Sequence, residues 1–370
     1  MMSKLFGSLV LFTLVATSSH PTPNTPPVVR LAAARAGEAD LVLTNARILT
    51  VDGRFRVAAA LAVRDGRFVA VGSNEEVRPH IGSGTRVIDG RGRTVVPGLI
   101  DTHVHALDVA EAEAAQPFEN IQSIGALQAW IRRAVASGPS IRSARSGQGD
   151  AWIWTPRVYP TRLREHRFPT REELDAVAPD RPVAVDGAYA FVLNSAALRA
   201  ARITRHSTDP PGGAIVKDAA GEPTGLLRNV GGLLAPFRLQ PGRVSLDMLE
   251  QIHRQYLATG ITSVIERGAT LDGYNSYQEL RRADRLRVRA TVTIRIPRAA
   301  EAAEVERFFQ GLAFRPGSGD DWLKVGPLKI VADGGILIGT SFMREPYGLR
   351  ARQLYAVDDP RYRGLLSLTP

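Results

Sequence analysis

The chain of 370 residues contains no cysteine. This absence excludes disulfide bonds, and it also excludes thiolate ligands for a metal ion. Any bound metal must therefore be held by histidine, by carboxylates or by a chemically modified lysine. The hydrophobic content of 44% is ample for a large core, so we expect one large domain and a smaller one.

Lysine is also scarce. Only four of the 47 basic residues are lysine, namely Lys4, Lys217, Lys324 and Lys329. A lysine inside an apolar strand is therefore unusual in this chain. The net charge is +10, but the basic residues are scattered and few aromatic residues lie among them, so the sequence does not predict nucleic-acid binding.

Long hydrophobic runs are confined to the N-terminus. Lys4 precedes an apolar run at 5–16, and small residues follow at 17–19. The run is shorter than the roughly 20 residues that a membrane span needs, and the pattern is typical of a secretory signal. We expect residues 1–19 to be a signal peptide and 20–38 a flexible leader. The mature protein would then be secreted or periplasmic, without a stable membrane span; an uncleaved anchor is the alternative.

The most informative motif is VVPGLIDTHVH, at 95–105. It reads as a short apolar strand that is entered through a Pro-Gly turn and ends in His-x-His. Side chains on a strand alternate between faces, so Asp101, His103 and His105 share one side. Two imidazoles on one face at a strand end are suited to holding a divalent ion, with Asp101 as a supporting group.

Residues 39–97 show β-branched runs that are separated by turns. Asp65-Gly66 stands between two of these runs and is a strong signal for a tight hairpin. The pattern predicts a small β-domain ahead of the His-x-His strand.

The motif VVPGLIDTHVH resembles the first barrel strand of the amidohydrolase superfamily of metal-dependent hydrolases. Further blocks resemble its amidohydrolase 3, or YtcJ-like, branch, and together the similarity covers about residues 40 to 370. These blocks are FPTREELDAVAPDRPVAV (168–185), FVLNSAAL (191–198), DPPGGAIVKDAAGEPTGLLRN (209–229) and LKIVADGG (328–335).

The resemblance implies an α/β fold, a (β/α)8 TIM-type barrel preceded by a small β-sandwich formed by residues 39–97. Residues 98–370 would be the N-terminal half of this barrel, with a long insertion at about 107–240. In the insertion we expect a helix near 123–136 and a second helix that opens near Thr170, whose spacing to Glu173 fits a capping box.

The remaining barrel elements follow from hydrophobic periodicity. We expect a helix at 246–259, followed by strands at 260–266, 288–296 and 325–332. Barrel strands deliver functional groups at their C-terminal ends, which places His105, Glu266 and Asp333 where chemistry is expected.

Lys329 is the second notable site, because it shares a strand face with Asp333. Burying an ammonium group is costly unless it is paired or modified. By resemblance, Lys329 is the position of a lysine that CO₂ carboxylates and that bridges two metals. The resemblance thus implies a metal site of His103, His105 and Lys329 that holds one or two divalent ions, Zn²⁺ first among them. Lys329 and Asp333 would be the catalytic residues; an ion pair between them is the alternative.

Three residues are candidates for contacting a substrate: Trp152, Tyr189 and Asn194. Many relatives carry histidine where Tyr189 stands. Trp152 is equally compatible with a lid over the substrate and with an anchor between packed elements. His253 lies between apolar helix positions, and we expect it to be a half-buried helix residue rather than a ligand.

The resemblance implies hydrolysis of carbon–nitrogen bonds other than peptide bonds, in small-molecule amides or formamides. A complete site of this family adds two further histidines and an aspartate that acts as the base, whereas no histidine follows His253 here. We therefore expect the N-terminal part of a longer enzyme, with weak or no activity by itself. A non-catalytic remnant and a secreted binding protein are the alternatives, and association of two half-barrels into a homo-oligomer stays open.

Overall fold

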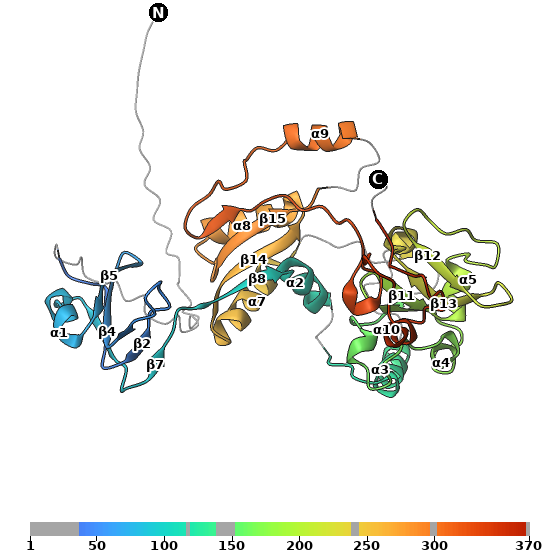
Figure 1. Cartoon of the computed structure of the whole chain (residues 1–370), viewed down its shortest axis with the longest axis horizontal. Helices are drawn as coiled ribbons and strands as arrows, with labels where there is room; N and C mark the ends of the chain where they lie inside the picture. Colours follow the sequence, from blue (N-terminus) through green and yellow to red (C-terminus); the bar gives the residue numbers. More distant parts are fainter. Residues whose placement is uncertain (1–36, 116–118, 138–151, 238–243, 297–301, 368–370) are drawn as a thin grey trace, which may run out of the picture. The chain divides into compact units, whose positions relative to one another are not determined.

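A computed structural model of the protein describes residues 37–115, 119–137, 152–237, 244–296 and 302–367. The expected signal peptide, and all but the last two residues of the expected leader, lie outside these ranges. The chain divides into two compact units, Met1–Pro97 and Gly98–Pro370 (Figure 1).

The described part of the first unit contains two small sheets. The larger has the strand order β5-β4-β1-β6, in which β1 pairs antiparallel with β4 and parallel with β6. Asp65 and Gly66 both have positive φ values, 51° and 71°, and they form the predicted hairpin between β4 and β5. The core is small and consists largely of alanine and valine, including Val42 and Val77. The elements are β1 (Leu41–Thr44), β2 (Arg47–Leu49), β3 (Val57–Ala58), β4 (Ala60–Arg64), β5 (Arg67–Gly72), α1 (Asn74–Val77), β6 (Arg86–Asp89) and β7 (Thr94–Val95).

The second unit contains a parallel four-stranded sheet with the order β16-β15-β14-β8. Its strands are β8 (Leu99–Val104), β14 (Ile261–Ala269), β15 (Arg289–Ile294) and β16 (Leu323–Val325). The helices α2 (Ala106–Ala115), α7 (Leu246–Ala258) and α8 (Leu271–Arg282) pack on one face of this sheet (Figure 1). Sequence-adjacent parallel strands joined by helices are the repeating unit of α/β folds. The sheet is not closed within the described residues, and β8 and β16 form its edges.

The strands of this sheet and the helices that cover it all contribute buried side chains to one core. Val104, Val264 and Val292 on the strands pack against residues such as Ile252 of α7 and Leu280 of α8. All five are at most 7% exposed. The core therefore lies between the sheet and the helices, and the strand residues that alternate with these valines point to the other face.

Two strand boundaries differ from the sequence prediction. The strand of the His-x-His motif was expected to begin at Val95, but Val95 belongs to β7 in the first unit and β8 begins at Leu99. Pro97 has no N–H group to donate to a ladder, which explains the interruption. The fourth strand was expected at 325–332, but β16 ends at Val325, before Gly326 and Pro327.

The insertion has a sheet of its own, which the sequence did not predict. Its strand order is β12-β13-β11-β10-β9, mostly antiparallel. The strands are β9 (Ile153–Trp154), β10 (Val183–Asp186), β11 (Ala190–Leu193), β12 (Ala214–Lys217) and β13 (Pro223–Arg228). The helices are α3 (Ile124–Ala136), α4 (Arg171–Asp175), α5 (Ser195–Ala200) and α6 (Gly231–Leu234), and later in the chain α9 (Ala302–Gln310) and α10 (Leu349–Leu354). Ile338 and Tyr355 share a buried cluster with Val183 of β10, so the C-terminal segment packs on the insertion.

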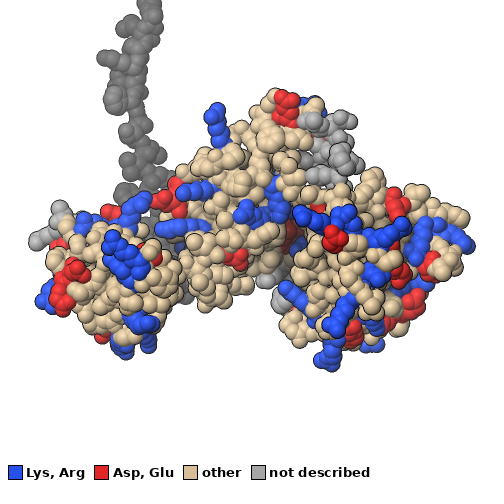
Figure 2. All heavy atoms as spheres, in the orientation of Figure 1, with Lys and Arg blue, Asp and Glu red and all other residues tan. Residues whose placement is uncertain are grey.

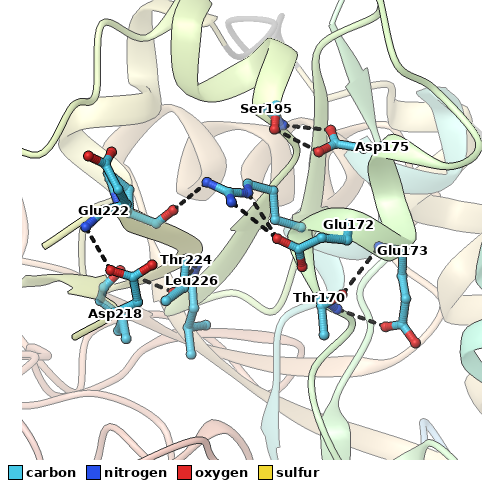
Figure 3. Close-up of polar contacts among 12 residues, drawn as sticks. Thr170, Glu172, Glu173, Asp175, Ser195, Asp218, Glu222, Thr224 and Leu226 are labelled. Carbon is cyan, nitrogen blue, oxygen red and sulfur yellow. Dashed lines mark hydrogen bonds and ion pairs between the residues drawn. The ribbon is translucent and has the colours of Figure 1, made fainter. Parts of the chain in front are cut away.

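Polar side-chain contacts hold the ends of the insertion helices α4 and α5 (Figure 3). Thr170 and Glu173 form the predicted capping box at the start of α4. Asp175, at the other end of this helix, accepts hydrogen bonds from the backbone N–H and the hydroxyl of Ser195, at 2.8 and 2.6 Å (Figure 3). The end of α4 is thereby tied to the start of α5.

The surface carries charges of both signs. On the face drawn in Figure 2, Lys and Arg side chains are mixed with Asp and Glu. In the ranges that the structure describes, we find no helix with the length and apolar character needed to cross a membrane.

Candidate metal centre

The two imidazoles of the His-x-His motif lie side by side at the end of β8. Their ring centroids are 5.3 Å apart, at an interplanar angle of 65°. Val104 between them is 7% exposed and packs into the helix-covered core. His103 therefore points away from that core, whereas the ring of His105 lies at its edge, close to the buried Glu266. The predicted adjacency of the two rings is confirmed. The ladder to β14 has an irregularity between Asp101 and Val104, so the alternation is not strict.

Asp101 supports the strand rather than a ring. One of its carboxylate oxygens accepts a hydrogen bond from the backbone N–H of His103, at 3.0 Å. The supporting role that the sequence suggested for Asp101 is thus directed at the backbone that carries the first imidazole.

Glu266 is the carboxylate that lies beside a ring. It comes from β14 and is 1% exposed. One of its oxygens, Oε1, lies 3.7 Å from Nδ1 of His105. The sequence placed Glu266 at a functional strand end but gave no reason to pair it with His105, because more than 150 residues separate the two motifs.

The surroundings favour the neutral form of both histidines. Desolvation lowers the pKa of His103 below 6.5, and the charges of Lys329 and Arg267 lower it further. Desolvation also lowers the pKa of His105, although Asp108 acts in the opposite direction. The neutral imidazole has the free lone pair that binds a metal ion.

Lys329 belongs to the same region, since its charge acts on both imidazoles. It is held by backbone pairing with the chain beside β15: its N–H donates to the carbonyl of Ile294 at 2.8 Å, and its carbonyl accepts from the N–H of Ile296 at 2.9 Å. The residue thus continues the direction of the fourth strand after the break at Pro327. Burial, followed by the charges of Arg295 and Arg267, lowers the pKa of Lys329.

The carboxylate of Asp333 has a partner of its own. It accepts a hydrogen bond from the backbone N–H of Phe342, at 2.8 Å, and so closes a loop. Among the described residues no ion pair joins Asp333 to Lys329, which removes the alternative of a Lys–Asp pair. The catalytic role expected for Asp333 has no support in its contacts.

The donor set fits a divalent ion in kind but is incomplete. Two neutral imidazoles are preferred zinc ligands, and a carboxylated lysine would add oxygen donors. Within the described ranges, however, no three His, Cys, Asp or Glu side chains gather in a way that would hold a metal. His103, His105 and Lys329 would thus hold one side of the ion, while a zinc site takes about four ligands.

Two of the three residues predicted to contact a substrate, Trp152 and Tyr189, pack against other side chains or backbone. Trp152 stacks on Phe237 with ring centroids 4.8 Å apart, and on Trp154 with centroids 6.0 Å apart, so it packs as an anchor within the insertion. Tyr189 is half-buried, and its ring lies against Gly335, two residues after Asp333.

The predicted substrate contact of Asn194 is wrong. Its side chain is fully buried and caps α5 by accepting from the N–H of Ala197, at 2.9 Å. It also accepts from Val183 N–H and donates to the carbonyls of Ala178 and Arg181, at 3.0, 2.7 and 2.8 Å. With these groups satisfied and no exposed surface, Asn194 holds the insertion together and does not contact a substrate. The buried cap is visible only once the fold is known.

The comparisons with known proteins show the family to which these features belong. A model of the amidohydrolase family, of the amidohydrolase 3 type, matches residues 86–362. The chain therefore belongs to the amidohydrolase family, as the resemblance predicted.

Individual relatives match over long stretches. The N-substituted formamide deformylase of Arthrobacter pascens is 34% identical over 258 residues, which are 66% of this chain and 45% of that protein. The YtcJ protein of Bacillus subtilis is 27% identical over 321 residues, or 83% of this chain and 54% of its own length. The chain thus spans about half the length of these curated relatives.

A solved structure supports the fold. The crystal structure of an uncharacterized metal-dependent hydrolase from Pyrococcus horikoshii matches 89% of this chain and 60% of its own, with a TM-score of 0.55 and 19% identity. A likeness at this identity shows the fold alone. The fold is thus α/β, and the four parallel strands with their helices are consistent with a TIM-type barrel that the described residues do not close.

Proposed function

We propose that the protein is a metal-dependent hydrolase of carbon–nitrogen bonds other than peptide bonds, acting on small amides or formamides. The observation that carries this proposal is the pair of neighbouring imidazoles at the end of β8, on both of which the charge of Lys329 acts. Membership of the amidohydrolase family and the similarity to a formamide deformylase support the reaction class.

A divalent ion, of which Zn²⁺ is our first choice, supplies a nucleophile by lowering the pKa of water toward neutrality, and it polarises the substrate carbonyl. In this chain His103 and His105 would hold it through neutral ring nitrogens. Lys329 would hold it as a carbamate, because its lowered pKa favours the amine form that reacts with CO₂, and the charges of Arg267 and Arg295 favour an anion there.

We further propose that residues 1–370 bind the metal weakly and turn over substrate slowly. Two imidazoles and one lysine are fewer ligands than zinc sites use. Of the carboxylates near these ligands, Glu266 is hydrogen-bonded to Leu107 and Tyr277, and Asp101 to the backbone of His103, so we expect neither to serve as a free base. Loss of a base alone lowers a rate by about 10²–10⁴-fold.

The test is zinc uptake by the purified chain, measured by equilibrium dialysis and elemental analysis. His103→Ala and His105→Ala should each lower the uptake, while His206→Ala, in an exposed loop, should leave it unchanged. Zinc uptake that is equal in all four proteins would contradict the proposed site.

A second assay measures metal-dependent hydrolysis of a panel of N-formyl and N-acyl amines. Rapid turnover by this chain would contradict the proposal of weak activity. Zinc uptake without any turnover would favour a binding protein.

A further inference from the structure

Glu266 occupies a position where a carboxylate is costly. It is 1% exposed and lies on the side of β14 that faces the helices, among core residues such as Val104 and Tyr277. Taking an ionised carboxylate out of water is unfavourable unless it is hydrogen-bonded and paired. An apolar residue would fill this part of the core at lower cost, so the contacts of the carboxylate need an account.

Those contacts join three parts of the unit. Oε2 accepts hydrogen bonds from the backbone N–H of Leu107, at 3.1 Å, and from the hydroxyl of Tyr277 on α8, at 3.3 Å. Oε1 lies 3.7 Å from Nδ1 of His105. The carboxylate therefore lies between the start of α2, the helix α8 and the ring of His105.

The contact with Leu107 has a clear structural purpose. The first N–H groups of a helix have no partner within it, and a negative charge near them is favourable. Leu107 is the second residue of α2, and Glu266 supplies one of its missing acceptors. The helix cap therefore accounts for the position of Oε2 but not for the position of Oε1 beside His105.

We propose that Glu266 is a positioning residue for His105. Oε1 lies 3.7 Å from Nδ1, just beyond hydrogen-bond distance, and its negative charge favours the form of the ring with the hydrogen on Nδ1 and the lone pair on Nε2. The hydrogen bond that one imidazole nitrogen makes decides which nitrogen is free to bind. Glu266 thereby sets both the orientation of the His105 ring and the ring nitrogen that carries the free lone pair. The role of that nitrogen as a metal ligand rests on the proposed function.

A positioning role and a purely structural role for Glu266 predict different effects of the substitution Glu266→Gln. If Glu266 only caps α2, a glutamine that keeps one acceptor oxygen would preserve its function. If Glu266 positions His105, glutamine would fail, because it has no charge and its amide group donates where an acceptor is required. Tyr277→Phe is the matched control, since it removes one donor from the carboxylate and leaves the carboxylate itself in place.

The experiment is nitrogen NMR of the full chain with ¹⁵N-labelled histidine, recorded without metal near pH 8, where imidazoles are neutral. The signals of His105 are assigned by their loss in His105→Gln. We expect the wild type and Tyr277→Phe to show hydrogen on Nδ1 of His105, and Glu266→Gln to shift the ring toward hydrogen on Nε2. Circular dichroism confirms that each variant is folded.

A wild-type ring with its hydrogen on Nε2 would overturn the proposal before any variant is made, as would an unchanged ring in Glu266→Gln. Zinc affinity is the second readout, and we expect Glu266→Gln to lower it about 10–100-fold, as for other residues that support a ligand histidine. The NMR readout involves no metal. If the ring depends on Glu266 while His105→Ala leaves zinc uptake unchanged, the metal site is wrong and the positioning stands.

Discussion

The imidazole of His253 on α7 packs against the phenol ring of Tyr277 on α8, with ring centroids 5.6 Å apart. His253 is fully buried, and within the described structure neither of its ring nitrogens has a hydrogen-bond partner. The expectation of a half-buried histidine is thus wrong, although its place on the helix is as predicted. Such a group is tolerated only in its neutral form, because burial of a charge is costly.

The first prediction concerns acid stability. Desolvation lowers the pKa of His253 to about 4 from its ordinary value of 6.5, so the unfolded chain takes up this proton more readily than the folded one. Stability is therefore retained above about pH 6.5 and lost as the pH falls toward 4. The loss amounts to roughly 3 kcal/mol, since each pKa unit corresponds to about 1.4 kcal/mol.

His253→Leu should remove this loss, because leucine fills a similar volume without a titrating group. Urea unfolding at pH 7.5 and pH 4.5 measures the effect, with the exposed His206→Leu as the control. Equal acid sensitivity in His253→Leu and the wild type would show that other groups cause it.

The second prediction concerns carboxylation of Lys329. If its neutral amine forms a carbamate, added bicarbonate should raise zinc uptake by the wild type. Lys329→Met should abolish this response, whereas Lys324→Met, at an exposed position on β16, should retain it. A bicarbonate response that persists in Lys329→Met would assign the effect to another group.

The third prediction separates structure from binding at Asn194. Asn194→Ala leaves several buried groups without partners and removes the cap of α5, so we expect a loss of about 3 kcal/mol in unfolding free energy. Zinc uptake of the folded variant should stay unchanged. Urea unfolding measures the loss, with the exposed Asn275→Ala expected to stay within about 0.5 kcal/mol of the wild type. A stable Asn194→Ala protein would contradict the structural assignment.

The fourth prediction concerns export. We propose that residues 1–19 act as a secretory signal and are removed, because Lys4 precedes a short apolar run followed by small residues. N-terminal sequencing of exported protein should begin after residue 18 or somewhat later. Material that begins at Met1 or Met2 would favour an uncleaved anchor.

The sequence was most informative where the cause is local. The spacing of His103 and His105, the turn at Asp65-Gly66 and the capping box of Thr170 and Glu173 are each set by residues within a few positions of one another. The helix expected over 246–259 is observed as α7, because its pattern of apolar residues is likewise local. The fourth strand was placed less well, since the break at Pro327 competes with an apolar pattern that continues through it.

By itself, then, the sequence determined the family, the order of the parallel strands and the pair of imidazoles, because strand alternation and helix periodicity act over short distances. The tertiary structure alone decided that Glu266 lies beside His105, that Asn194 is buried and fully hydrogen-bonded, and that the carboxylate of Asp333 bonds the backbone of Phe342. These outcomes depend on contacts between distant segments. Whether a polar side chain serves as a ligand, a cap or a support is set by burial and by the partners that folding brings to it.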